Sequence, residues 1–158
     1  MMSVQSLMNA LEAWVQEELL ARRRFLELLE TQEAAVKRAE AQGLADSVNA
    51  IEKEIEAQLR RDEKRVRLFA ELGHHWGVTG DVLTLTSIAE RAGDAGRRLA
   101  TLRDELAAAS DRIVRKNRRV SRLLEAHQKV IEELLQALVA IQGGVPGGST
   151  GALVNAEA

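Results

Sequence analysis

The sequence contains no cysteine and no tyrosine, a single proline, and only 3% aromatic residues. Without cysteine, the chain can form no disulfide framework, no thiolate metal site and no cysteine nucleophile. The shortage of aromatic residues removes much of the material from which β-rich folds are built. Alanine, leucine, glutamate and arginine predominate instead, and these residues favour helices. The 158 residues therefore predict an all-α chain with the size of one domain.

Strong net charge and long apolar runs are also missing. The formal net charge is −2 at pH 7, so no global positive field attracts nucleic acid or an anionic membrane. No apolar run approaches the roughly 20 residues that a membrane-spanning helix needs. The first five residues lack the basic and apolar regions of a signal peptide. We expect a cytoplasmic protein that does not insert into a membrane.

Apolar residues recur every three or four positions in three long segments, a spacing typical of helices with one buried face. We expect these helices at about residues 3–42, 44–72 and 99–141. Gly43 and Gly73 are predicted to end the first two, because glycine favours the position just after a helix. The apolar stripe of the second helix is narrow and is interrupted by one aspartate.

The segment between the second and third long helices has a different character. Residues 73–81 are rich in glycine and predict a loop, in which His74, His75 and Trp76 would cover one end of the helices. A short helix is expected at about residues 85–92. Thr84 can cap it, and the spacing of Ser87 and Glu90 would also fit a start one turn later.

These elements predict an antiparallel up-down-up bundle of three long helices, similar to a coiled coil, with a short extra helix between the second and third. The bundle is expected to occupy residues 1–142. Residues 143–158 are rich in glycine and predict a flexible C-terminal tail.

The third long helix has the most regular apolar seam, and its C-terminal half is apolar on almost two sides. With expected helix lengths of roughly 60, 45 and 70 Å, the second helix cannot cover the end of the third. We therefore predict a partner-binding surface there; a homodimer seam and burial against the first helix are the alternatives. Its residues are Asn117, Val120, Leu124, His127, Ile131, Leu134, Leu135, Leu138 and Ile141.

No arrangement of residues supports catalysis, a cofactor or a bound metal. The adjacent His74 and His75 lack partners at the spacing of a zinc site. His127 has no serine and acid arranged around it as in a hydrolase. The glycines between residues 143 and 148 are not followed by the lysine of a phosphate-binding loop. The sequence predicts a protein that is not an enzyme.

A run of basic residues at positions 112–122 is a candidate for binding nucleic acid. Residues 94–122 contain nine basic and four acidic side chains, and a basic helix can bind phosphates. No aromatic residues lie within the run, and the rest of the chain is slightly acidic. We favour pairing with acidic surfaces of the other helices, or with an acidic partner, over nucleic acid.

Four features follow one another along the chain: the helix end at residues 65–73, the Leu-Thr-Leu segment at residues 83–89, Asn117, and the apolar helix at residues 120–138. Their order resembles the FlgN family, the cytoplasmic export chaperones for the flagellar hook-filament junction proteins. The resemblance covers about residues 5–141.

The resemblance implies that the chain binds the C-terminal helical segments of flagellar hook-associated proteins and keeps them unassembled. It also implies that the chain presents them to the gate of the type III export apparatus. Neither step requires an ATP site, because binding equilibria determine whether a client protein is held or released. A self-associating structural coiled-coil protein is the alternative, and a nucleic-acid-associated helical protein is a weaker one.

Overall fold

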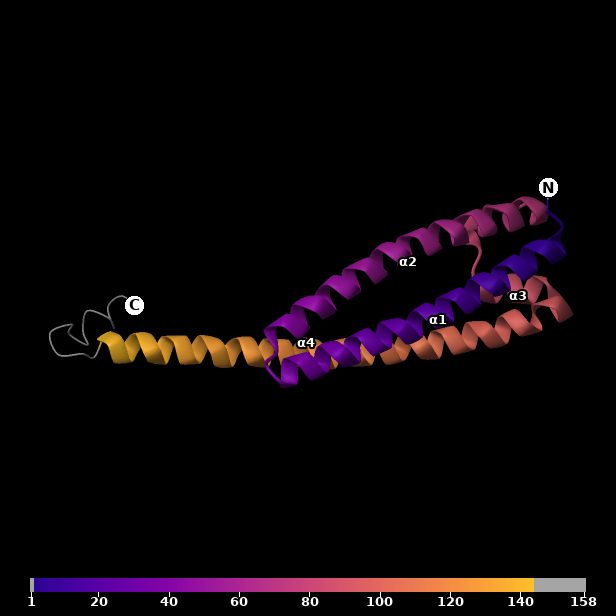
Figure 1. The fold of residues 1–158 in the computed structure, drawn as a ribbon. Helices are drawn as coiled ribbons and strands as arrows, with labels where there is room; N and C mark the ends of the chain where they lie inside the picture. Colours follow the sequence, from indigo (N-terminus) through magenta and orange to yellow (C-terminus); the bar gives the residue numbers. More distant parts are fainter. Residues whose placement is uncertain (1, 144–158) are drawn as a thin grey trace. The chain divides into compact units, whose positions relative to one another are not determined.

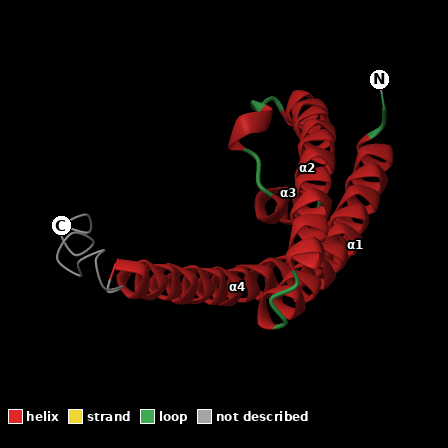
Figure 2. Cartoon of the chain, turned by 60° about the vertical axis from the view of Figure 1, so that its left-hand side comes forward, coloured by secondary structure: helices red, strands yellow, loops and turns green. Residues whose placement is uncertain are grey.

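The computed structural model describes residues 2–143, and these residues are helical without any strand (Figure 2). The α-helices are α1 (Val4–Lys37), α2 (Ala41–Trp76), α3 (Leu85–Arg91) and α4 (Arg97–Gly143). Two short 3₁₀ turns, η1 (Gly80–Val82) and η2 (Gly93–Gly96), flank α3 along the chain. Figure 1 labels α1, α2, α3 and α4. The prediction of an all-α chain is confirmed, with four α-helices in the described range. Apart from Gly143, which ends α4, the predicted tail lies outside the described residues.

The chain divides into two compact units, residues 1–118 and residues 119–158, and the boundary falls inside α4. The first unit contains α1, α2, α3 and the first part of α4. The second unit contains the remainder of α4. Each unit is described by itself below.

Side-chain contacts give the directions of the long helices in the first unit. Lys64 of α2 contacts Glu17 of α1, and Arg61 contacts Glu18, so α2 runs antiparallel to α1. Arg98 and Lys116 of α4 contact Glu12 and Glu33 of α1. The first part of α4 therefore runs alongside α1 in the same direction.

The hydrophobic core lies at the end of the first unit where α3 packs. α1 contributes Leu7, Leu11 and Val15, which are fully buried. Residues of α2, α3 and α4 complete the same cluster, because each helix directs one apolar side toward α1. The main contributors are Leu68, Phe69, Leu72, Ile88, Leu99 and Leu102.

The predicted break at Gly43 is wrong. α1 ends at Lys37, and the chain turns at Ala39, which takes a positive φ of 55°. Gly43 lies inside the first turn of α2, where an added Cβ would lie 3.4 Å from Cβ of Ala35. The short side chains at this corner let the first turn of α2 approach α1.

The predicted helix end at Gly73 is also wrong, and with it the loop at residues 74–76. α2 continues through Trp76 and is capped by Gly77, whose φ of 66° is left-handed. Gly73 is needed for a different reason: a Cβ there would lie 2.5 Å from the carbonyl oxygen of Val78. The backbone N–H of Val78 donates to Gly73 O at 2.9 Å, so the chain folds back directly over this glycine.

α3 begins where the sequence predicted. Thr84 caps it, and Thr84 and Ser87 form a reciprocal capping box, with Ser87 N–H donating to Thr84 Oγ1 at 3.0 Å. The box satisfies two backbone donors that the start of a helix otherwise leaves unpaired. The alternative start one turn later is therefore wrong.

The two internal glycines of α2 should respond oppositely to alanine. Gly73→Ala forces a Cβ against backbone and should destabilise the protein by about 1–3 kcal/mol. Gly43→Ala makes only ordinary contacts and should be neutral or stabilising by up to about 1 kcal/mol, because alanine restricts the unfolded chain. Chemical denaturation of both variants beside the wild type tests this, and equal effects would contradict it.

Candidate protein-binding surfaces

The residues predicted to bind a partner occupy different environments on α4. Five of them, at positions 131, 134, 135, 138 and 141, are between 55% and 69% exposed. Leu124 and His127 are half-buried, and Asn117 is exposed. Val120 is only 1% exposed, so it does not belong to the exposed surface.

The exposed apolar side chains lie along one side of α4. Steps of three and four residues place them within one broad sector of the helix, and polar residues such as Glu125, Lys129 and Gln136 occupy the other side. Val130, which was missing from the predicted set, is 54% exposed and widens the same sector. We call this surface the C-terminal face. It consists of Leu124, His127, Val130, Ile131, Leu134, Leu135, Leu138 and Ile141.

The width of the C-terminal face indicates what can cover it. A narrow seam of alternating three- and four-residue steps is sufficient for pairing with one helix. Here Val130 and Leu135 extend the apolar sector beyond that seam on both sides. The C-terminal face is therefore a contiguous exposed apolar patch that is wider than one helix–helix seam.

Val120 and Leu134 occupy equivalent positions on the seam but should respond differently to charge. Val120→Asp places a carboxylate in a buried position and should lower the melting temperature clearly. Leu134→Asp changes an exposed side chain and should leave the melting temperature within a few degrees of wild type. Calorimetry on both variants tests this; a large loss for Leu134→Asp would place that residue in the core.

A second apolar surface lies in the first unit, between α2 and the first part of α4. It is a cleft of about 350 Å³, and Ala21, Arg22 and Phe25 of α1 also line it. Sequence reasoning missed it, because the apolar stripe of α2 was expected to be buried. The structure instead leaves Ile55 and Leu59 of that stripe 51% and 63% exposed. We call this cleft the α2 groove. Its apolar lining residues are Phe25, Ile55, Leu59, Ile113 and Val114.

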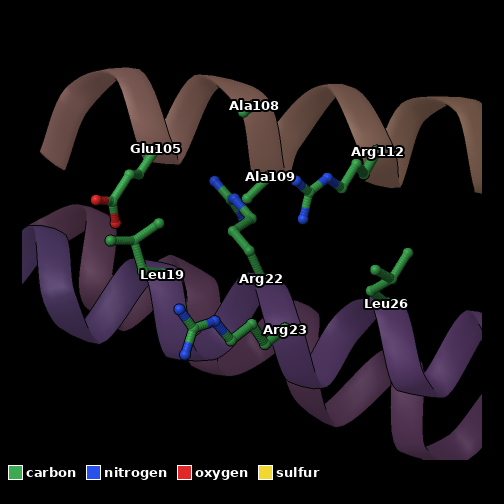
Figure 3. Close-up of a pocket in the computed structure, with 8 residues that line it drawn as sticks. All are labelled: Leu19, Arg22, Arg23, Leu26, Glu105, Ala108, Ala109 and Arg112. Atoms are coloured by element: carbon green, nitrogen blue, oxygen red, sulfur yellow. The ribbon is translucent and has the colours of Figure 1, made fainter. Parts of the chain in front are cut away.

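A smaller cleft of about 240 Å³ lies between α1 and α4 in the same unit. Figure 3 shows Arg22 reaching from α1 and Arg112 from α4 into the space between the two helices, with Glu105 beside Leu19. Arg112 belongs to the basic run of α4. Another member of the run, Lys116, donates to Glu33 of α1 at 2.7 Å. Part of the basic run is thus directed at α1.

A cluster of charged side chains joins α1 to α2 beside the α2 groove. Glu18 is 1% exposed, and its carboxylate accepts from Arg61 Nε at 2.8 Å and from Gln58 at 3.2 Å. Arg61 also donates to Glu54 at 2.7 Å, and its backbone carbonyl accepts from Trp14 Nε1 at 2.8 Å.

Two opposing effects act on Arg61. Burial disfavours its charge, but the hydrogen bonds to Glu54 and Glu18 and the charges of these carboxylates outweigh burial. The pKa of the Arg61 guanidinium therefore lies above its ordinary value. The guanidinium stays charged and neutralises the buried Glu18.

Removing Arg61 should be costly, because the buried Glu18 loses its shorter ion pair, at 2.8 Å, and retains only the pair with Arg22 at 3.4 Å. We expect Arg61→Met to destabilise the protein by about 3–5 kcal/mol. Lys64→Met removes the exposed pair with Glu17 and should cost less than about 1 kcal/mol. Urea denaturation of the two variants measures the difference. Similar losses would mean that the Glu18 cluster contributes no more than a surface pair.

Within residues 2–143, no three histidine, aspartate or glutamate side chains are placed to hold a metal ion. No helix in that range is long and apolar enough to cross a membrane.

The described residues form an all-helical protein with two exposed apolar surfaces. The family model described as FlgN protein matches residues 1–150, which is most of the chain. The chain therefore belongs to the FlgN family, a family of flagellar chaperones. Comparison with curated proteins and with solved structures gave no match.

Proposed function

We propose that this chain is a cytoplasmic chaperone that binds the C-terminal helical segments of flagellar hook-associated proteins. It keeps them unassembled and presents them to the gate of the type III export apparatus. Family membership supports the general role. The observation that carries the proposal is the C-terminal face, where five leucine and isoleucine side chains between Ile131 and Ile141 are more than half exposed.

The chemistry of this face suits an amphipathic helical client. Such a client buries its own apolar side against the face and completes a small helical bundle. Because Val130 and Leu135 widen the face beyond one seam, two client helices can pack on it together. While they are bound, the apolar sides of the client helices are unavailable for assembly with other copies.

Release requires no nucleotide in this proposal. Binding and release follow from the concentrations of client and competing partners, so a partner that binds the client or the chaperone more tightly shifts the equilibrium. The export gate would act as such a partner.

Self-association through the same face is the second candidate. It is favoured by the regular three- and four-residue steps from Asn117 to Ile141, the pattern with which two identical helices form a coiled coil. A homodimer would use the residues that the chaperone needs for its client, so the two candidates can be separated by one set of variants.

The test compares two double variants with equal added charge. Leu134→Asp/Leu138→Asp places two carboxylates on the C-terminal face, and Gln136→Asp/Ala140→Asp places two on the opposite side at the same spacing. Both should melt near the wild type. Because burying each leucine contributes about 1.5–3 kcal/mol, the first variant should bind a hook-associated C-terminal segment at least about 100-fold more weakly. The second should bind it normally, as measured by titration calorimetry.

Two results would contradict the proposal. Undiminished binding by the Leu134/Leu138 variant would place the client elsewhere on the chain. A wild-type dimer that this variant converts to monomer, with no effect on client capture, would favour self-association. Sedimentation on the same preparations gives the mass in solution.

A further inference from the structure

The basic run of α4 concentrates positive charge over about three helical turns. Residues 112–122 contain six basic side chains and no acidic one. In the first unit, three arginines of this run are exposed, and no carboxylate within residues 2–143 lies at ion-pair distance from any of them. We call these three residues, Arg112, Arg115 and Arg118, the arginine face.

The arginine face has few acidic neighbours on its own helix. Residues three and four positions apart are neighbours on a helix surface. At these steps, Arg112 and Arg118 have no acidic neighbour, and Arg115 has one, Asp111. The positive charge of the arginine face is therefore not balanced along α4.

The acidic residues of α1 do not balance this charge either. Glu27 and Glu30 are exposed, but neither lies at ion-pair distance from an arginine of α4 within residues 2–143. Glu33 is already paired with two lysines. In the cleft between α1 and α4, Figure 3 shows Glu105 at the opposite end from Arg112.

Repulsion within the arginine face opposes the stability of the free helix. The steps of three residues bring Arg112 close to Arg115, and Arg115 close to Arg118, and like charges at such steps destabilise a helix. Contacts within the folded chain do not relieve this repulsion. A partner that supplies carboxylates would relieve it, because arginine binds a carboxylate through two parallel hydrogen bonds.

We propose that the arginine face binds a short acidic segment of another protein. The rise of a helix places successive arginines about 4.5 Å apart along the axis of α4. A partner helix with glutamate or aspartate at every third or fourth position presents carboxylates at the same spacing. The arginine face shares no residue with the C-terminal face or the α2 groove, and the inference does not depend on the proposed chaperone function.

A nucleic acid fits this surface less well than an acidic protein segment. The phosphates of a duplex continue in both directions, but Asp111 precedes the basic run and Glu125 follows it. These carboxylates repel a phosphate backbone that extends past the run. No aromatic side chain in residues 112–122 provides a surface on which bases could stack.

The chain itself supplies no better occupant. Residues 144–158 contain one acidic side chain and no other charge. Carboxylates of a second copy would bring basic neighbours with them: Arg24 lies three residues from Glu27 on α1, and Arg60 lies four residues from Glu56 on α2. Such neighbours would repel the arginine face.

The experiment uses two synthetic helical peptides of the same composition and about four turns. One has glutamate at every third or fourth position along one side, and the other has the same glutamates distributed around the helix. The full-length protein should bind the first peptide, with an affinity that falls as salt rises. It should bind the second about fivefold more weakly, because fewer ion pairs form at once. A short DNA duplex is the third probe and should bind more weakly than the first peptide.

A triple variant locates the binding. Arg112→Gln/Arg115→Gln/Arg118→Gln should weaken the first peptide about tenfold, the sum expected of three exposed ion pairs. Its melting temperature should equal or exceed that of the wild type, because glutamine favours helices and the repulsion is removed. A loss of binding therefore cannot be attributed to unfolding.

The matched control makes the same change in net charge on α2. Lys53, Arg60 and Arg67 are exposed, and Arg60 and Arg67 alternate with glutamates on that helix. Lys53→Gln/Arg60→Gln/Arg67→Gln should therefore have little effect on the peptide. Leu134→Asp/Leu138→Asp should also leave it bound.

Several outcomes would overturn the inference. Equal binding of the two peptides, or equal weakening by the two glutamine variants, would indicate attraction to net charge alone. Tighter binding of the duplex, lost in the Arg112/Arg115/Arg118 variant, would assign the surface to nucleic acid. A wild-type dimer that this variant converts to monomer in sedimentation would show that a second copy occupies the arginine face.

Discussion

Glu18 carries a negative charge at a position that water barely reaches, and the first unit is arranged to accommodate it. Its carboxylate is held by Arg61 of α2, which is itself held by Glu54 and by the indole of Trp14. Sliding α2 by one turn would separate these partners and leave the buried charge with Arg22 of α1, at 3.4 Å, as its remaining basic partner. The cluster thus specifies the register of α1 against α2. That register in turn sets which side chains of α2 enter the core and which line the α2 groove.

The two apolar surfaces differ in how they are built and therefore in what they can bind. The C-terminal face is one side of a single helix, so a partner must bring further helices to complete a bundle. The α2 groove is lined by residues of three helices, α1, α2 and the first part of α4. The chain therefore presents two apolar surfaces that are built differently.

Local signals predicted the helix starts better than the helix ends. The Thr84–Ser87 capping box involves neighbours in sequence, and the start of α3 was predicted from Thr84 alone. The predictions based on glycine were wrong at both ends of α2, because glycine occurs in proteins for more than one structural reason. Gly77 is present for its left-handed backbone, while Gly73 is present because backbone passes too close for a Cβ. Only the tertiary contact of Gly73 with Val78 shows that Gly73 has a different structural role from Gly77.

The sequence by itself determined the all-α class, the extent of α4 and the helical seam from Asn117 to Ile141, since composition and periodicity are properties of the chain alone. The FlgN resemblance also came from the order of local features, and the family match supports it. Only the tertiary structure decided which seam residues face water. Val120 and Leu134 share one seam, and Phe69 and Ile55 share one stripe, yet the first of each pair is buried and the second is exposed. Periodicity specifies the side of a helix that is apolar, but burial depends on whether other residues distant in sequence pack against that side.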